Sequence, residues 1–402
     1  MWIHRSITPV IRRALAQFPA VVLTGARQVG KTSLTRHLLP KGDYITFDLP
    51  AEAELARLDP EGFFGRHREP LILDEVQYVP EIFRSLKRYI DADRRPGRYL
   101  LTGSQDFLLM ARITESLAGR IAVLTLPSLE MEEALGEKAR IEDVDRFLWR
   151  GGFPELWQRP ELDQELWFGS YLTTYLERDV RNLSNVGNLR NFDRFLRAIA
   201  LRVGQLLSMA EVARDVGVSP NTIKNWISIL QASQQIFLLE PYHTNRGKRL
   251  IKTPKIYFSD TGLLALLLGF RQLKELMGSP LWGQMWENLV VMETRKKFLN
   301  LGKRPALYFW RTANGEEIDL LVERAVDRYW GIECKTAAEV SSSALKGVRS
   351  FRQTYGDHVM KHASVICRTR QVYPLSKGER DLALPLAGPD GALELLAKHI
   401  TT

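Results

Sequence analysis

A glycine-rich segment, "GARQVGKT" at residues 25–32, limits the folds open to this chain more than any other feature. The apolar run before it predicts a buried β-strand, and an amphipathic helix is expected after it. The glycines let the backbone wrap so that successive N–H groups point at phosphate oxygens, at the positive end of a helix. The sequence therefore predicts a nucleotide-binding loop in an α/β fold. The residues expected to bind the nucleotide are Gly25, Ala26, Arg27, Gln28, Val29, Gly30, Lys31, Thr32 and Ser33.

Polar side chains in and after this loop supply the predicted chemistry. Lys31 would reach the β- and γ-phosphates, and the Thr32 hydroxyl would hold Mg²⁺. A second motif, "LILDEVQ" at residues 71–77, predicts a strand that ends in two adjacent carboxylates. Asp74 would complete the Mg²⁺ shell, and Glu75 would polarise the attacking water. The expected cofactors are therefore ATP and Mg²⁺, and the expected reaction is ATP hydrolysis.

Two further positions are candidates for contact with the γ-phosphate. A third predicted strand, residues 98–105, ends at Ser104, which is expected to act as a sensor between the carboxylates and the nucleotide; an ordinary strand-to-turn boundary is the alternative. Arg120 precedes another strand and would reach the γ-phosphate of a neighbouring subunit, since an arginine there strongly accelerates phosphoryl transfer. Arg112 is a rival, and a solvated surface arginine is the alternative. A homo-oligomer follows if Arg120 acts in trans.

Four segments together, GARQVGKT, LILDEVQ, LLTGS and SLAGR, resemble those of an AAA+-type P-loop ATPase family of bacteria and archaea. Members of that family carry a carboxy-terminal domain of unknown function. Residues 149–156 and 171–180 are also similar to the family's helical segment. The resemblance covers most of the chain and implies ATP binding by an oligomerising ATPase.

A chain of 402 residues is too long for one core and implies about two to four domains. The expected fold class is a multidomain α/β protein. Its predicted parts are an AAA+ P-loop ATPase core at 1–128, a helical lid at 129–185, a winged-helix domain at 186–275 and a restriction-endonuclease-like α/β domain at 276–402.

Composition narrows the partners and the compartment. The net charge of +9 and the pI near 9.5 favour a polyanionic partner, most simply DNA. With two cysteines and no zinc-like Cys/His spacing, a disulfide framework and a structural zinc site are not expected. The longest apolar stretch, residues 262–270, is about half as long as a membrane span. A cytoplasmic protein without a membrane partner is expected.

Residues 208–233 predict a helix-turn-helix with its turn at Gly217. The second helix would leave five polar residues outward, namely Asn221, Thr222, Lys224, Asn225 and Ser228, and the first four are expected to contact DNA. Residues 235–260 predict the two strands and the tip of a wing. Basic residues expected to follow the phosphate backbone from this wing are Arg246, Lys248, Arg249, Lys252 and Lys255. The alternative is a winged helix that joins domains without touching DNA.

Residues 281–385 predict helix, three strands, helix and strand, and this order resembles the restriction-endonuclease-like fold with its PD-(D/E)xK site. On that resemblance Asp319 is the first acid, Glu333 the second, Lys335 the lysine, and Glu287 the acid of the first helix. Carboxylates on neighbouring strands can bind Mg²⁺, and the lysine can orient or deprotonate a water. The alternative is an internal ion pair between Lys335 and Glu333 in a domain that clamps DNA passively.

These features lead to three hypotheses. The first is an ATPase that couples turnover to DNA binding or remodelling, with branched DNA among its substrates. The second adds Mg²⁺-dependent DNA cleavage at the nuclease-like site. The third is a regulatory ATPase whose carboxy-terminal half binds a protein. A stretch of basic residues was expected to contact nucleic acid under the first two hypotheses, and it comprises Arg295, Lys296, Lys297, Lys303, Arg304 and Arg311.

Overall fold

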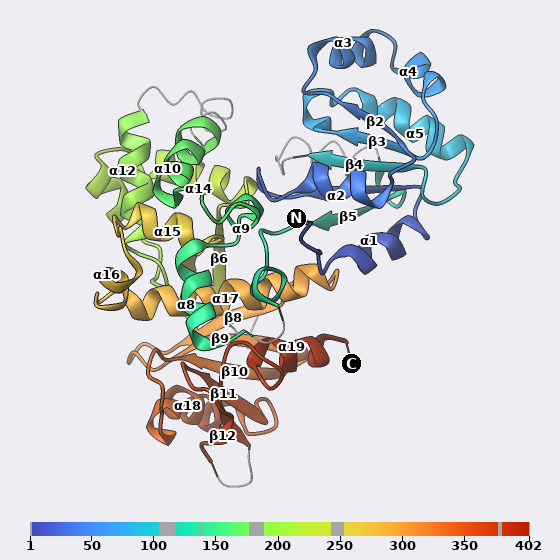
Figure 1. Cartoon of the computed structure of the whole chain (residues 1–402). Helices are drawn as coiled ribbons and strands as arrows, with labels where there is room; N and C mark the ends of the chain where they lie inside the picture. Colours follow the sequence, from blue (N-terminus) through green and yellow to red (C-terminus); the bar gives the residue numbers. More distant parts are fainter. Residues whose placement is uncertain are drawn as a thin grey trace. The chain divides into compact units, whose positions relative to one another are not determined.

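The computed structural model describes residues 2–103, 117–136, 139–176, 189–242, 253–376 and 380–401 (Figure 1). The chain divides into two compact units. The amino-terminal unit comprises Met1–Ser128, Ala232–Gln234 and Leu299–Lys303. The carboxy-terminal unit comprises Leu129–Gln231, Gln235–Phe298 and Arg304–Thr402.

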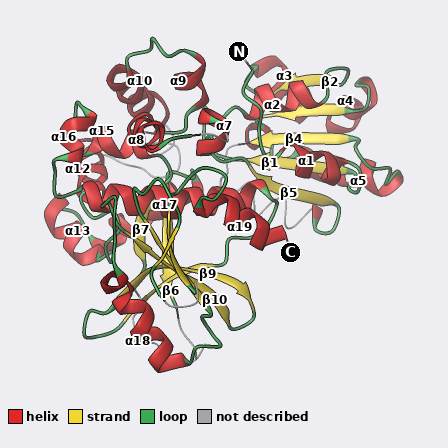
Figure 2. Ribbon diagram, turned by 60° about the horizontal axis from the view of Figure 1, so that its bottom comes forward, coloured by secondary structure: helices red, strands yellow, loops and turns green. Residues whose placement is uncertain are grey.

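The amino-terminal unit is built on a parallel sheet of five strands in the order β2-β3-β4-β1-β5. The strands are β1 Ala20–Thr24, β2 Asp43–Thr46, β3 Leu71–Asp74, β4 Tyr99–Gly103 and β5 Ile121–Thr125. The helices are α1 Thr8–Leu15, α2 Lys31–Leu38, α3 Pro50–Leu58, α4 Pro60–Arg66 and α5 Ile82–Ala92. Figure 2 shows the yellow strands side by side with red helices along them. Every residue of β1, β3 and β4 is buried, as their apolar runs predict.

The order of the strands brings the motifs of this unit together. Strand β1 lies between β4 and β5, and β4 lies between β1 and β3. Because the strands are parallel, their carboxyl ends meet at one edge, where ligands of open α/β sheets bind. The glycine-rich loop after β1 and the carboxylates at the end of β3 therefore lie at the same edge.

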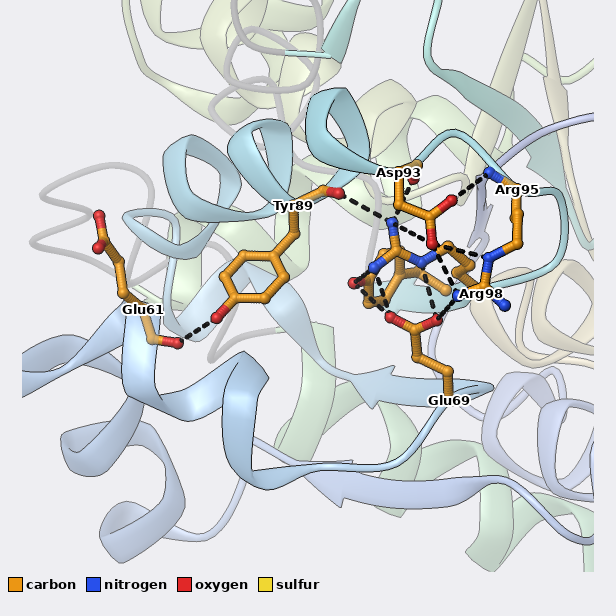
Figure 3. A network of polar contacts seen from close by, with 7 residues as sticks. Glu61, Glu69, Tyr89, Asp93, Arg95 and Arg98 are labelled. Atoms are coloured by element: carbon orange, nitrogen blue, oxygen red, sulfur yellow. Dashed lines mark hydrogen bonds and ion pairs between the residues drawn. The ribbon is translucent and has the colours of Figure 1, made fainter.

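At the other edge, Arg98 joins the starts of two strands (Figure 3). Its side chain is 7% exposed and donates to both carboxylate oxygens of Glu69, with Nε–Oε2 at 2.8 Å and Nη2–Oε1 at 2.5 Å. It also donates to the Tyr89 carbonyl of α5 at 2.8 Å. Glu69 lies two residues before β3, and Arg98 immediately before β4. The network thus fixes both strand starts against α5.

The carboxy-terminal unit begins with short helices and continues into a mixed α/β region. The first helices are α7 Met131–Leu135, α8 Ile141–Arg150, α9 Pro154–Gln158, α10 Gln164–Tyr171 and α12 Leu189–Ala200. The later ones are α13 Met209–Val216, α14 Pro220–Ala232, α15 Thr261–Leu267, α16 Leu273–Met277, α17 Trp282–Asn300, α18 Lys346–Tyr355 and α19 Ala392–Thr401. The region expected as a lid is thus helical in its described residues, and its role as a lid stays a prediction.

Helices α13 and α14 follow the predicted helix-turn-helix pattern. Gly217 ends α13 with φ +81, a left-handed conformation that suits glycine. Trp226 of α14 is buried against two aromatic rings of α12, with centroid distances of 5.4 Å to Phe192 and 5.1 Å to Phe195. The apolar spacing of α14 therefore selects the face that packs against α12.

An eight-stranded sheet completes this unit, in the order β12-β13-β11-β10-β9-β8-β6-β7. Its strands are β6 Ile236–Pro241, β7 Lys255–Phe258, β8 Leu307–Arg311, β9 Glu317–Ala325, β10 Arg328–Cys334, β11 His362–Ile366, β12 Tyr373–Pro374 and β13 Asp381–Leu384. The predicted order of elements is present as α17, β8, β9, β10, α18 and β11. The expected wing strands β6 and β7 pair with each other, and β6 also pairs with β8. The winged-helix and restriction-endonuclease-like assignments stay predictions.

The prediction that a stretch of six basic residues contacts nucleic acid is wrong for two of them, Lys296 and Lys297. Lys296 is buried and bonds to Glu293 at 2.8 Å and to the Leu129 carbonyl at 2.9 Å. Lys297 is buried against Glu132 at 2.5 Å. Neither lysine is available to a nucleic acid, because internal carboxylates and carbonyls already take up their donors.

No helix among the residues that the structure describes is long and apolar enough to span a membrane.

Candidate functional site

The glycine-rich loop has backbone conformations that only glycine adopts without strain. Gly25 has φ +153, and a Cβ there would lie 2.3 Å from the carbonyl oxygen of Leu126. Gly30 has φ +92 at the N-cap of α2. The loop therefore passes close to Leu126 and delivers the first N–H groups of α2 to its concave side, which is the geometry that binds phosphate.

Lys31 lies across this loop and is 5% exposed. Its Nζ donates to the carbonyl of Gly25 at 3.1 Å and to that of Ala26 at 2.9 Å. The ammonium group is thus held at the loop, where phosphate oxygens would offer it stronger, charged acceptors. The predicted role of Lys31 fits this position.

Asp74 accepts hydrogen bonds from three hydroxyl groups on three different elements. Thr32 of α2 donates to Oδ2 at 2.8 Å, and Tyr44 of β2 donates to the same oxygen at 2.7 Å. Thr102 of β4 donates to Oδ1. Burial, followed by the hydrogen bond to Asp74, raises the pKa of Tyr44, which therefore stays a neutral donor. The hydroxyl of Thr32 and the carboxylate of Asp74 are hard oxygen ligands, so the pair fits a Mg²⁺ site beside the loop.

Glu75 follows directly after β3 and has φ +57. Its carboxylate accepts a hydrogen bond from the amide of Gln77, and its backbone N–H donates to the Thr102 hydroxyl at 3.3 Å. The half-buried side chain lies beside Asp74 in sequence and at the same sheet edge. This is the position expected of a residue that orients an attacking water.

Three residues of this site were missed by sequence reasoning. Thr102 ends an apolar strand as a polar residue, a signal like the one that drew attention to Ser104. Tyr44 and Arg5 belong to no motif. Arg5 is 3% exposed and donates at 2.7 Å both to the Val29 carbonyl in the loop and to the Pro127 carbonyl. Its guanidinium group therefore links the loop at Val29 to the segment that follows β5.

The two candidates for γ-phosphate contact have different outcomes. Ser104 lies outside the described residues, as does the rival Arg112. Arg120 lies within the described residues and makes a bidentate ion pair with Asp91, with Nε–Oδ1 at 2.8 Å and Nη2–Oδ2 at 3.0 Å. Its action on a neighbouring subunit stays a prediction.

A second set of predicted residues meets between β9 and β10. The Cys334 N–H donates to Asp319 Oδ2 at 2.7 Å, and Lys335 Nζ lies 3.4 Å from Glu333 Oε2 and 4.0 Å from Asp319 Oδ2. Burial, and then the charge of Asp319, raises the pKa of Glu333 to about 9. The structure thus brings Asp319, Glu333 and Lys335 together, with the ammonium group of Lys335 next to the carboxyl group of Glu333.

Glu287 of α17 is engaged by residues of β7. It accepts from Lys255 Nζ at 2.9 Å and from the Tyr257 hydroxyl at 2.6 Å. The side chain of Lys255 is 2% exposed and also pairs with Glu317. Burial opposes the charge of Lys255, but Glu287, Asp319 and Glu317 outweigh burial and raise its pKa. Lys255 was expected on an exposed wing, and that prediction is wrong: it is an internal counterion.

Whether these acidic residues bind a metal ion stays a prediction. Within the described ranges, no group of three or more His, Cys, Asp or Glu is arranged to hold one. Lys255 Nζ donates to Glu287, and Lys335 Nζ lies beside Glu333 and Asp319. A lysine next to the two acids is itself part of the predicted site, so metal ligation by Asp319, Glu333 and Glu287 stays a prediction.

The predicted DNA-contacting residues of α14 lie largely on its open face. Asn221, Lys224 and Asn225 are exposed. Thr222 is half-buried, and its hydroxyl lies 2.9 Å from that of Ser219 at the start of the helix. The predicted wing residues Arg246, Lys248, Arg249 and Lys252 lie outside the described residues.

Three family models each match a part of this chain. A family model described as an AAA domain matches residues 17–135. Two models of domains of unknown function match residues 141–274 (DUF8612) and 282–387 (DUF4143). Uncharacterized proteins of Mycobacterium bovis and Mycobacterium tuberculosis are each 34% identical over 375 residues, which cover 93% of this chain and 82% of theirs. Among solved structures, a Walker-type ATPase of Pyrococcus abyssi has a TM-score of 0.44 at 16% identity and covers 65% of this chain and 94% of its own.

Proposed function

The chain belongs to one family with these two mycobacterial proteins and is an ATPase of the AAA type, and we propose that it couples ATP hydrolysis to the binding or remodelling of DNA. The observation that carries the proposal is the combination of the glycine-rich loop and its Thr32–Asp74 contact with an exposed, polar and acid-free face on α14. The first part supplies the energy, and the second is suited to a polyanionic partner.

At the hydrolytic centre, each residue has a role that follows from its position. The loop N–H groups and Lys31 would bind the phosphates, while Thr32 and Asp74 would hold Mg²⁺, whose charge stabilises the leaving phosphate when it is bound. Glu75 would orient the attacking water and accept its proton. Thr102 would fix the positions of Asp74 and Glu75 relative to each other, because its hydroxyl donates to Asp74 and accepts from the backbone N–H of Glu75.

The proposed DNA contact rests on the chemistry of α14. Amide side chains such as those of Asn221 and Asn225 can bond to base edges or phosphates, and Lys224 can neutralise a phosphate. The net charge of +9 favours association with a polyanion. DNA cleavage at Asp319, Glu333 and Lys335 is not part of the proposal and stays a prediction. Binding of a protein partner by the carboxy-terminal half stays a prediction.

DNA binding by the purified protein tests the proposed contact. The triple variant Asn221→Ala/Lys224→Ala/Asn225→Ala is expected to bind duplex DNA about tenfold more weakly than the wild type. Its dependence of log K on log salt should be shallower by about one, because one phosphate contact is lost. Fluorescence anisotropy at several salt concentrations measures both quantities.

Lys274→Ala is the matched control, since it removes the same charge from the exposed face of α16. It should bind DNA as the wild type does. Equal affinities for the triple variant and the control, or no salt-dependent binding by the wild type, would remove α14 from the proposal.

A further inference from the structure

A depression of about 350 Å³ opens on the carboxy-terminal unit between the turn of the β9–β10 hairpin, the start of β11 and α19. Among the described residues that line it there is no Asp or Glu. Besides Tyr329, its charged and titratable lining residues are Arg324, Arg328, His358, Lys361, His362 and His399. A concave surface whose charged and titratable side chains other than Tyr329 are all cationic or imidazole groups is suited to an anion.

This depression is separate from the acidic cluster described above. Ala325 at the end of β9 pairs with Arg328 at the start of β10, which places the depression at the turn of the hairpin. Asp319 and Glu333 lie near the opposite ends of the same two strands. The two sets of charges therefore do not neutralise one another through contact.

Arg324 and His399 show how the positive charges are accommodated. Arg324 Nη2 lies 2.7 Å from His399 Nδ1. Arginine has donors and no acceptor, so His399 must accept at Nδ1 and be neutral. Burial lowers the pKa of His399, and the charges of Arg324 and His362 lower it further. His399 is therefore neutral, so it does not repel the positive charge of Arg324.

Asp327 lies in the hairpin turn beside Arg328 but does not line the depression, and two carboxylates on neighbouring segments have other partners. Asp357 pairs with Arg380 at 2.8 Å, and Glu394 of α19 pairs with Lys398 at 3.5 Å. Within the described part of the chain, no ion pair involves the side chain of Arg328 or Lys361. Both side chains are exposed. Arg328 is the first residue of β10, and Lys361 directly precedes β11.

We propose that this depression is an anion site that takes a phosphate-bearing ligand, with Arg328 and Lys361 as its principal contacts and Arg324 behind them. The guanidinium fork matches phosphate oxygens in pairs, and the ammonium group adds a point charge. Phosphate of this kind comes from a nucleic-acid backbone or from a small phosphorylated molecule. Only the first source rests on the proposed function in DNA binding.

Binding of inorganic pyrophosphate tests the site directly. The measurement is calorimetry on the full chain carrying Lys31→Ala, so that the nucleotide loop contributes little. Adding Arg328→Gln/Lys361→Gln is expected to weaken binding about tenfold or more, the effect of losing charge-assisted hydrogen bonds. The exposed pair Lys274→Gln/Lys346→Gln removes the same charge elsewhere and should leave binding as it was.

Equal weakening by the two double variants, or none by either, would overturn the proposal, since the response would then follow net charge or nothing at all. Repeating the comparison with duplex DNA assigns the source. If Arg328→Gln/Lys361→Gln weakens the binding of both pyrophosphate and duplex DNA, the natural ligand is a nucleic-acid backbone. If it weakens the binding of pyrophosphate alone, the natural ligand is a small phosphorylated molecule. If DNA binds to no variant while the pyrophosphate result holds, the DNA function fails and the anion site stands.

Discussion

Asp74 illustrates at the residue scale how a catalytic carboxylate is held in one orientation. Its two oxygens receive hydrogen bonds from Thr32, Tyr44 and Thr102, which lie on α2, β2 and β4. A carboxylate fixed from three elements loses little further entropy when it engages a metal shell, and such preorganisation is a main source of catalytic power. The three hydroxyl groups should therefore contribute unequally but measurably to turnover.

Thr102→Val should slow ATP hydrolysis by about tenfold or more, with little change in KM for ATP. The substitution keeps the shape of the side chain but removes both the donor to Asp74 and the acceptor for the Glu75 N–H. Steady-state kinetics measure the effect, and Thr354→Val on the exposed face of α18 is the control. A rate equal to that of the wild type would show that Thr102 does not position the carboxylates.

Tyr44→Phe should have a smaller effect, because Thr32 still donates to the same oxygen of Asp74. We expect a loss of about two- to fivefold in rate and a higher Mg²⁺ concentration for half-maximal rate. Titration of the rate with Mg²⁺ separates this positioning role from a loss of folding. Tyr89→Phe removes a hydroxyl whose partner is the Glu61 carbonyl and should leave the Mg²⁺ dependence unchanged.

Local patterns predicted the part of the site that lies in contiguous motifs. The loop residues, Asp74 and Glu75 follow a glycine spacing and a strand end that are legible without a structure. Tyr44 and Arg5 come from segments without a motif, and they reach the site only because β2 pairs with β3 and the amino terminus packs beside the loop. Such contacts depend on long-range pairing, which no short window of sequence encodes.

At the scale of elements, Arg98 joins β3, β4 and α5 through a nearly buried ion pair with Glu69. Arg98→Ala should lower the free energy of unfolding by about 3 kcal/mol, because it removes the bidentate partner of Glu69 and leaves the Tyr89 carbonyl without the Arg98 donor. Among the described residues, Glu69 would then keep only the Tyr99 hydroxyl as a hydrogen-bond donor. Arg88→Ala breaks an exposed ion pair with Glu61 and should cost less than about 1 kcal/mol. Chemical denaturation of both variants compares them, and equal costs would contradict the assigned role of Arg98.

The same ion pair predicts a dependence on pH. The hydrogen bond from Arg98 lowers the pKa of Glu69 below its ordinary value of 4.5. In acid, the unfolded chain therefore takes up this proton before the folded chain does, so the stabilisation is present above that value and is lost as pH falls through the folded pKa. Glu69→Gln should cost more stability at about pH 6 than at about pH 3. An equal cost at both values would show that the charge of Glu69 does not contribute.

Lys255 holds the sheet of the carboxy-terminal unit to α17 through Glu287. Lys255→Met should destabilise this unit by about 3–5 kcal/mol, because it leaves a buried carboxylate without its counterion. The double variant Lys255→Met/Glu287→Gln should recover part of that loss, since the uncompensated charge is then removed. Urea unfolding measures both, and a double variant as unstable as the single one would show that the two residues are not coupled.

The elements themselves were largely predictable, and their pairing was not. Periodicity predicted the strands at 20–24 and 71–74 and the two helices around Gly217. It gave no sign that β6 pairs with β8 and so extends the carboxy-terminal sheet. A strand shows its own faces in its sequence, but its neighbour depends on the competition among all strands of the chain.

At the scale of the whole molecule, the number of lysines and arginines does not show where the basic surface lies. Lys255, Lys296 and Lys297 are buried and paired with Glu287, Glu293 and Glu132, so these pairs add nothing to the net charge of +9 or to the surface. The surfaces that we propose for a polyanion lie on α14 and around the depression at the turn of the β9–β10 hairpin. An account based on composition alone would have assigned DNA contact to residues that cannot reach it.

We propose that the rate of ATP hydrolysis at the site around Asp74 responds to DNA. The most direct test is the steady-state rate of ATP hydrolysis by the wild type without DNA and with single-stranded, duplex and branched DNA. We predict a several-fold rise with at least one of these DNAs, a rise that fades at high salt, and no hydrolysis by Lys31→Ala under any condition. A wild-type rate that is the same with every DNA and without any would contradict the account.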